Sequence, residues 1–440
     1  MIIQALNIFI QGFSFTTTKG LITMQKFSNI NIARINLANL ALGRDKMKFE
    51  DRLNFNMNEV YKAIDGMTDI GDILQALSAL ECYKDALNGV FSIPVESDTN
   101  SSMMLIMGCI TRDVQSLEYV GLGADVPQRT YTKLEAEFRK DCAEAKVKIA
   151  DELDDFKHQG AIPYGYAGDS CIKRLIGQKA FKVWEQTYAK CLPGCAKYRQ
   201  ACLDAWNPHA FAYQWSLPDG YQVVTPVLGD GKKFGVNIGT YRVEYNMAQN
   251  EPRPTYIEKK NARGEIDYVR NPKTKALGAN TIHSLDAYAL REIARRCNMT
   301  KGRALEILQK CKKSIQDIQD FPELARLEEC VTDMGIISAR WFYLLEDNPV
   351  RLPKGIEAGL ERLAKTLGNN SFDLMVIHDA FGCTCNHVNY LRKTANQVFA
   401  DFYAGNMMQY FSRQLRLDVE VQKFDKAIYQ KILDSDYLVH

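Results

Sequence analysis

Two aspartates end short apolar runs, and they are the residues of this sequence best suited to metal-dependent chemistry. Asp98 follows IPVES and Asp379 follows LMVIH, and both runs are rich in β-formers. If the two strands are neighbours in one sheet, both carboxylates lie at the same edge and can hold two Mg²⁺ ions for a phosphoryl displacement. Spacing alone favours a structural role, because Asp often starts a turn or caps a helix. His378 alternates to the opposite strand face, where a buried, hydrogen-bonded role is favoured over metal ligation.

Basic side chains are concentrated between residues 291 and 313. Eight Lys or Arg stand there against two acids, which makes a local charge of +6 in a chain whose total is +2. The eight are Arg291, Arg295, Arg296, Lys301, Arg303, Lys310, Lys312 and Lys313. Two interpretations are open: a solvated helix face, or a track for the phosphate backbone of a nucleic acid.

Hydrophobic periodicity predicts the elements that must position these residues. Two strands carry the aspartates, over 90–98 and 372–381. A Pro-Asp-Gly turn predicts a β-hairpin within 211–246, and the polar, proline-containing stretch 247–279 predicts a loop or extended arm. Helices are predicted over 29–42, 58–83, 101–111 (buried), 130–158, 172–192 and 284–318, and from about Val388.

The composition is that of a folded protein of roughly two or three domains. A net charge of +2 excludes a globally basic nucleic-acid coat. The twelve scattered cysteines are expected to be reduced, buried thiols rather than disulfides or a zinc site.

The sequence contains no run of eighteen apolar residues, no signal-peptide pattern and none of the motifs G-x-S-x-G, GxxxxGK[ST] or HExxH. We expect a soluble, cytoplasmic protein without membrane partners.

Seven segments, in order, resemble the single-subunit phage-type RNA polymerases of bacteriophages and mitochondria. PVESDTNSS with the downstream Arg112 and Asp113 is similar to motif A, and VIHDAFG (376–382) is similar to motif C. WSLPDGY (215–221) resembles a W-x-x-PDG-aromatic hairpin, and NTIHSLDAYALR (280–291) resembles an N-x-x-HSxD-x-x-x-LR segment. The others are Gln11-Gly12 with TKGLIT (18–23), INLANLALGRDKMKFEDRLNF (35–55) and the terminal ILDSDYLVH.

The resemblance implies an α+β right-hand polymerase fold, with a palm sheet and mainly helical fingers. It implies template-directed RNA synthesis, in which an RNA 3′-hydroxyl attacks the α-phosphorus of an NTP. Asp98 and Asp379 would hold two Mg²⁺ ions, with the backbone carbonyl of Thr99 as a further ligand. The domains would be palm with motif A (1–125), fingers with motif B and the hairpin (126–279), and a last part with the end of the fingers, motif C and the C-terminal foot (280–440). If the protein is phage-encoded, its compartment is the host cytoplasm.

Motif B, the fingers helix that binds the incoming nucleotide, departs from the family pattern. The family carries R-x-x-x-K followed eight residues later by Tyr-Gly, whereas DDFKHQGAIPYGYAG has Leu153 at the arginine position. Lys157 matches the triphosphate-binding lysine, and Tyr164 and Tyr166 follow it by seven and nine residues. Both tyrosines remain candidates for the base-stacking, sugar-sensing role.

Two further residues are assigned to ribose selection by the resemblance. His283 stands in the HSxD segment, and Tyr131 is placed similarly to a second tyrosine of the family. The basic residues Arg291, Arg295, Arg296, Lys301 and Arg303 would line the path of template or transcript.

The second departure is a missing part. No DxxGR motif is present, and neither the thumb nor the N-terminal, promoter-reading domain is matched. The sequence therefore resembles the larger, catalytic subunit of a split, heterodimeric phage RNA polymerase, whose partner supplies the thumb and the DxxGR motif. Other expected partners are a DNA template, the RNA transcript, NTPs and an accessory initiation factor. The alternatives are a family A-like DNA polymerase and a non-catalytic, nucleic-acid-binding polymerase subunit.

Overall fold

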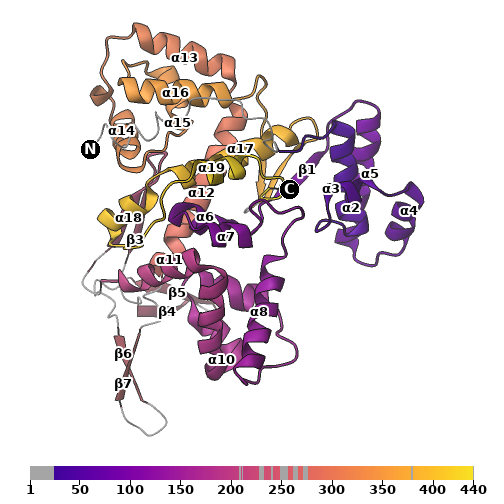
Figure 1. Ribbon diagram of the computed structural model, residues 1–440. Helices are drawn as coiled ribbons and strands as arrows, with labels where there is room; N and C mark the ends of the chain where they lie inside the picture. The colour runs from indigo at the N-terminus through magenta and orange to yellow at the C-terminus, as the bar shows by residue number, and fades with distance from the viewer. Residues whose placement is uncertain are drawn as a thin grey trace.

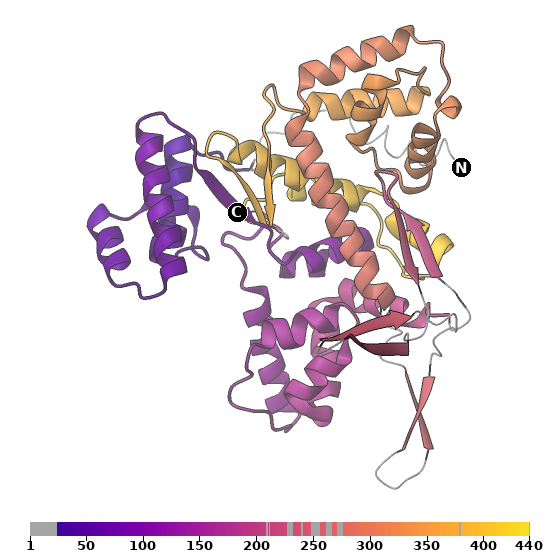
Figure 2. The ribbon, with the colours of Figure 1, turned by 180° about the vertical axis from the view of Figure 1, so that it is seen from behind.

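The protein is mainly helical, with a few small antiparallel sheets, as Figures 1 and 2 show. The computed structural model describes residues 24–207, 210, 212–226, 232–238, 241–247, 256–260, 266–270, 276–377 and 380–439. This architecture confirms the coarse α+β prediction.

The described helices run almost from one end of the chain to the other. They are α2 Asn29–Leu42, α3 Phe49–Leu53, α4 Met57–Asp65, α5 Ile70–Leu87, α6 Ser102–Thr111, α7 Val114–Tyr119, α8 Thr130–Glu144, the π-helix η1 Phe156–Ala161, α9 Ile162–Gly165, α10 Asp169–Cys191, α11 Pro193–Asp204, α12 Ala276–Asn298, α13 Lys301–Lys313, the 3₁₀-helix η3 Ile318–Asp320, α14 Pro322–Met334, α15 Arg340–Asp347, α16 Lys354–Thr366, α17 Val388–Ala404, α18 Met407–Leu415 and α19 Lys426–Leu433.

The described strands form one three-stranded sheet and three hairpins. The sheet has the order β1-β9-β8, with β1 Pro94–Asp98, β8 Met375–Ile377 and β9 Ala380–Thr384. The hairpins pair β2 Ala212–Ser216 with β3 Gln222–Pro226, β4 Lys232–Ile238 with β5 Tyr241–Met247, and β6 Tyr256–Lys260 with β7 Ile266–Arg270.

Three helices from distant parts of the chain form the centre of the molecule. Helices α6, α12 and α17 pack on one another within the largest apolar core, and every residue from Met103 to Thr111 of α6 is buried. Around this centre lie α8, α10 and α11 on one side, α13 to α16 on another, and a lobe of α2 to α5 beyond the three-stranded sheet (Figures 1 and 2). The lobe and the α13–α16 group each have a separate apolar core.

Several predicted elements are confirmed. The helix over 29–42 has the predicted bounds. Ser28 caps its N-terminus by accepting a hydrogen bond from the Asn31 N–H, and Gly43 caps its C-terminus with a left-handed φ of +61°. The buried helix after Asp98 and the Pro-Asp-Gly hairpin are also present.

Other predictions were wrong at the boundaries. The single strand over 372–381 is two antiparallel strands in which Ile377 pairs with Ala380. The stretch 247–279, predicted as a loop or extended arm, contains the paired strands β6 and β7 and also the start of α12. The helix over 130–158 ends at Glu144, just before Lys146 takes a left-handed φ of +56°.

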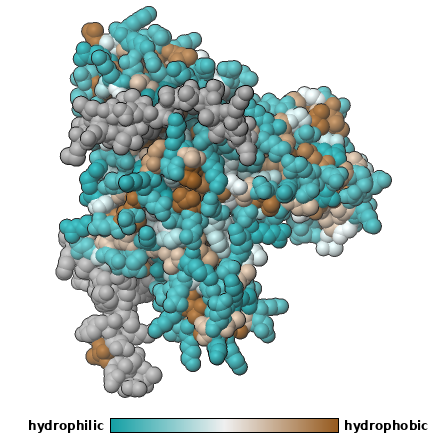
Figure 3. Space-filling view, viewed as in Figure 1, coloured by the Kyte–Doolittle hydropathy of each residue, from teal (hydrophilic) through white to brown (hydrophobic). Residues whose placement is uncertain are grey.

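Figure 3 shows a mostly hydrophilic face with apolar patches, some of them over the α2–α5 lobe. Within the part of the chain that the structure describes, no helix combines the length and apolar character needed to cross a membrane.

Candidate active site

The three-stranded sheet brings the two aspartate-bearing segments together. Asp98, the last residue of β1, pairs with Ala380 of β9, and Ala380 pairs in turn with Ile377 of β8. Asp379 and His378 lie outside the described residues. Ile377 and Ala380, the residues on either side of His378 and Asp379, are in register with Asp98 across the sheet. Strand β9 lies between β1 and β8.

One face of this sheet is open and carries carboxylates. Along β1 the exposed residues Pro94, Glu96 and Asp98 alternate with buried ones. Their partners on β9 include Ala380 and Gly382, whose small side chains leave the carboxylates uncovered. The opposite face contributes Val95 and its neighbours to the main core.

Glu96 was missed in the sequence although the signal was there. It precedes Asp98 by two residues, so strand alternation puts both carboxylates on one face.

The C-terminal segment fixes the backbone just after Asp98. Thr99 forms an antiparallel bridge with Val439, and the Asn100 N–H donates to the Leu438 carbonyl at 2.9 Å. The Arg392 guanidinium of α17 binds the same C-terminal segment by donating hydrogen bonds to the carbonyls of Asp436 and Val439. Thr99, whose carbonyl the resemblance assigns to a metal ion, therefore lies in a rigid part of the backbone.

The Arg-Asp pair after this strand has structural roles. The Arg112 guanidinium donates to the carbonyls of Tyr403 and Gly405 at 2.9 Å each, where α17 ends. The Asp113 carboxylate caps α7 by accepting from the Ser116 N–H at 2.7 Å. The two Arg112 bonds tie α6, the helix after Asp98, to the end of α17.

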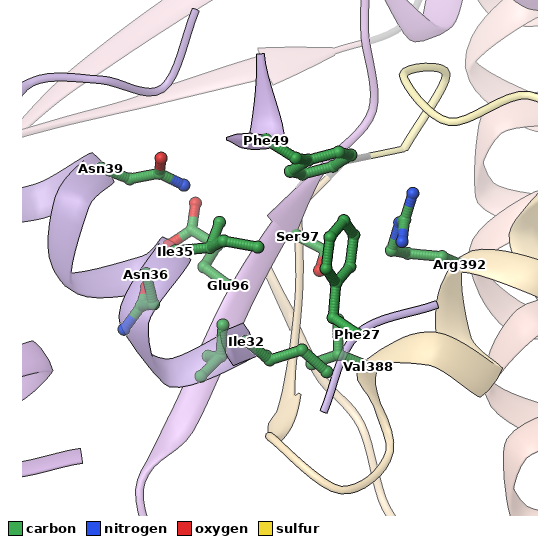
Figure 4. A pocket seen from close by; sticks show the side chains of 11 residues that line it. Phe27, Ile32, Ile35, Asn36, Asn39, Phe49, Glu96, Ser97, Val388 and Arg392 are labelled. Carbon is green, nitrogen blue, oxygen red and sulfur yellow. The ribbon is translucent and has the colours of Figure 1, made fainter. Parts of the chain in front are cut away.

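A small pocket beside β1 is a packing void rather than a substrate site. Figure 4 shows it between α2, β1 and α17, with Ile32, Phe49, Glu96 and Arg392 among the side chains around it. Its volume of about 30 Å³ suffices for about one water molecule and is far too small for a nucleotide.

A second group of residues lies between the α8–α10 region and α12. The rings of Tyr166 and His283 are 4.4 Å apart between centroids, with an interplanar angle of 56°. The Lys157 ammonium lies 5.5 Å from the centroid of the Tyr131 ring. Four residues that the sequence assigned to nucleotide binding are therefore found as two contacting pairs.

His283 is partly open to solvent, but neighbouring atoms desolvate its imidazole. This desolvation lowers the pKa of His283 below its usual value of about 6.5, so the ring is neutral at pH 7. A neutral imidazole can both donate and accept a hydrogen bond, which suits it to a hydroxyl group.

A π-helix lies between Lys157 and Tyr166, in the segment that resembles motif B. Residues Phe156–Ala161 form η1, and the Ile162 N–H donates to the Lys157 carbonyl, five residues earlier. Pro163, which follows directly, has no N–H to continue an α-helical ladder. A π-turn holds one residue more than an α-turn, so Tyr166, nine residues after Lys157, takes the place that would be eight residues away in an α-helix.

The residue after Tyr166 has a backbone conformation that is unusual for a residue other than glycine. Ala167 has φ +65°, a left-handed conformation that glycine adopts most easily. The family pattern has Gly at this position.

Tyr164, the other tyrosine named as a candidate for nucleotide binding, is buried in this structure. Only 3% of it is exposed, and it packs edge-on against Trp184 and Tyr188 while the Arg199 guanidinium lies 3.9 Å above its ring. Burial raises the pKa of its hydroxyl. Tyr164 is a core residue, whereas Tyr166 is half-buried and faces His283.

The two groups are connected through α6. A Cβ on Gly165 would collide with the Met103 side chain, so the turn that carries Tyr166 packs closely on this helix. Met103 is five residues beyond Asp98 on the helix that follows β1.

The hairpin β2–β3 and helix α12 interlock through the residues that defined their motifs. The Trp215 indole N–H donates to the Ser284 hydroxyl at 3.1 Å. The Asp219 carboxylate accepts from Arg291 and from Arg295 at 2.8 Å each. Burial would raise the pKa of Asp219, but these two hydrogen bonds outweigh it and lower the pKa.

An open pocket of about 300 Å³ lies between the hairpin and α12. Tyr221, Val223 and Thr225 line it from the hairpin, and Asn280 and His283 line it from the helix. His283 thus faces both Tyr166 and a space large enough for a nucleobase.

Several basic side chains of this stretch pair with carboxylates, most of them far away in the sequence. Arg296 is 2% exposed and donates to the nearby Glu292 at 2.9 Å and to the distant Asp401 at 2.7 Å, so in this structure its charge is paired in the core. Arg291 and Arg295 bind Asp219, and Arg303 binds Glu346. Lys301 is half-buried, and its N–H donates to the Gly368 carbonyl.

Comparison with known proteins leaves the family open. No protein-family model matches the chain, and no curated protein matches it significantly.

The donor set of the sheet edge is suited to a hard cation. Asp98 is exposed at the end of β1 beside the small Ala380, which leaves room for an ion and its water ligands. Within the described ranges, which omit Asp379, no three His, Cys, Asp or Glu side chains gather as a metal site.

Proposed function

We propose that this chain is the catalytic palm-and-fingers subunit of a DNA-directed RNA polymerase of the right-hand type. The observation that carries the proposal is the pairing of Asp98 with Ala380, the neighbour of Asp379, on a sheet with one open face. Two carboxylates at adjacent strand ends are the arrangement that two-metal nucleotidyl transfer requires.

Asp98 and Asp379 would hold two Mg²⁺ ions, with the Thr99 carbonyl as a further ligand. When bound, Mg²⁺ lowers the pKa of the RNA 3′-hydroxyl and neutralises the pyrophosphate that leaves. The bridge from Thr99 to Val439 keeps the strand end rigid, which favours a fixed position for the carboxylate.

The pairs in the fingers supply the nucleotide-binding part of the proposal. The exposed ammonium of Lys157 is suited to the triphosphate, and Tyr131 packs beside it. Tyr166 and His283 would contact the sugar, and a neutral His283 can hydrogen-bond a 2′-hydroxyl. DNA template, RNA transcript and NTPs are the ligands of this arrangement.

A second subunit is part of the proposal. In the split polymerases that the sequence resembles, a partner polypeptide supplies the DxxGR motif and the thumb, and we propose such a partner here. An accessory initiation factor or a single-stranded template would then replace the promoter-reading domain.

The test is primer extension by the chain co-purified with its partner, on a primed template, with Mg²⁺ and either NTPs or dNTPs. Asp98→Asn and Asp379→Asn are each expected to abolish extension while binding of the template persists. Glu420→Gln, at an exposed carboxylate elsewhere, serves as the matched control and should extend normally.

Three outcomes would contradict the proposal. Substantial extension by Asp379→Asn would overturn the metal assignment. Preferential use of dNTPs would identify a DNA polymerase instead. Binding without extension by the unsubstituted complex would indicate a non-catalytic subunit.

A further inference from the structure

Two thiols from opposite ends of the chain meet at the joint between the α2–α5 lobe and the three-stranded sheet. Cys82 lies on α5, and Cys385 directly follows β9. Their sulfur atoms are 3.6 Å apart, and both side chains are at most 3% exposed. All twelve cysteines are free thiols, and this is the pair whose sulfur atoms are in contact among the residues that the structure describes.

We propose that Cys82 and Cys385 are a dithiol oxidation site that a hydroperoxide converts into a disulfide linking the lobe to the sheet. The distance between the sulfur atoms is short enough that a small shift of either side chain allows a bond. This inference does not depend on the proposed function.

The surroundings make Cys82 the thiol that reacts first. Either thiol can donate the hydrogen bond between them, and this contact lowers the pKa of Cys82. Thiolates rather than thiols attack peroxides, and the exposed connection at residues 88–90 leads to the segment that Cys82 contacts, so we assign Cys82 as the nucleophile and Cys385 as the resolving thiol.

The segment between α5 and β1 provides access to these buried thiols. Residues 88–90 are exposed, and the Cys82 sulfur lies 3.8 Å from the carbonyl of Ile93 in the same segment. Local opening of this short connection would uncover Cys82 without unfolding either core.

The reaction balances in two steps. The Cys82 thiolate attacks one peroxide oxygen, the O–O bond breaks, and the products are a sulfenic acid and, after protonation, water or an alcohol. The Cys385 thiol then attacks the sulfenic sulfur, the S–O bond breaks, and a disulfide and water form. The two thiols lose two electrons in total, and the hydroperoxide gains them.

The closed bond would join β9, which holds Ala380 opposite Asp98, to the helical lobe. Its effect would be to restrict movement of the lobe relative to the sheet, because a covalent bond would replace the weak contact between the two sulfur atoms.

The experiment treats the native, full-length chain with a small excess of hydrogen peroxide, then alkylates the remaining thiols and maps the peptides by mass spectrometry. We expect a Cys82–Cys385 peptide pair, lighter by two hydrogens, that disappears after reduction with dithiothreitol. Cys383→Ala, two residues away on β9, is the matched control and should still form the link, whereas Cys82→Ala and Cys385→Ala should not.

A second measurement uses the unsubstituted chain, so its result does not depend on whether the variants fold. Oxidation of the unsubstituted chain should raise its melting temperature, and reduction should restore the original value. Recovery of both residues as separately alkylated thiols, or a link that forms only in denaturant, would overturn the proposal.

Discussion

At the scale of single residues, the contrast between Tyr164 and Tyr166 separates a core side chain from a candidate ligand contact. They stand two residues apart in the same turn, yet one is enclosed by Trp184 and Tyr188 and the other meets His283. A half-buried hydroxyl beside a neutral imidazole can discriminate a ligand with a 2′-hydroxyl from one without it.

The substitution Tyr166→Phe is therefore expected to relax sugar selection. Loss of one hydrogen bond of about 1.4 kcal/mol corresponds to a roughly tenfold rise in the ratio of dNTP to NTP incorporation. Single-nucleotide extension by the complex measures this ratio. Tyr164→Phe is the matched control and should leave it unchanged; equal effects of the two substitutions would refute the assignment of Tyr166.

At the scale of elements, the hairpin β2–β3 and helix α12 behave as one unit. Asp219 is 1% exposed in its side chain and is bound by two arginines of α12, while Arg340 donates to its backbone carbonyl at 2.7 Å. This arrangement orients the helix that carries His283, so under the proposed function the hairpin contributes indirectly to nucleotide binding.

Asp219→Asn is expected to lower the free energy of unfolding by about 3 kcal/mol at pH 7, because it leaves two partly buried arginine charges without their carboxylate. The folded-state pKa of Asp219 is lowered, so its stabilisation is complete above the unfolded value of about 3.9 and is lost as pH falls through the folded pKa. Urea unfolding of both proteins between pH 7 and pH 3 tests this. The exposed Asp125→Asn should change nothing, and a difference that persists undiminished at low pH would contradict the assignment.

At the scale of the whole molecule, the α2–α5 lobe exposes an apolar stripe. Ile70, Leu74 and Leu77 follow one another at helical spacing on α5 and are 74%, 61% and 45% exposed. A contiguous exposed apolar surface commonly marks a contact with another protein. Under the proposed function, the partner subunit is the molecule expected to cover it.

Leu74→Glu combined with Leu77→Glu should accordingly reduce co-purification of the partner by at least about tenfold, since each burial of a leucine contributes about 1.5–3 kcal/mol. The melting temperature of the chain alone should remain unchanged because both side chains are exposed. Ile315→Glu, at a side chain that is 94% exposed on another part of the molecule, is the control. Undiminished capture of the partner would show that the stripe is not the interface.

Local chemistry determined much of this protein at the level of sequence. The spacing of apolar residues placed α2 within its observed bounds, and the Pro-Asp-Gly turn specified the β2–β3 hairpin. Such features depend on neighbours within a few residues. The apolar run around Asp379 gave no turn signal, so the two strands β8 and β9 could not be separated from one strand.

Only the tertiary structure decided which charges and rings remain available to a ligand. Arg296 lies on the basic stretch in sequence, but Asp401, 105 residues away, neutralises it in the core. Tyr166 became distinct from Tyr164 because a π-turn sets the register and α12 brings His283 to one side of it. Burial and ion pairing depend on contacts between distant segments, and a linear pattern of residue types does not contain them.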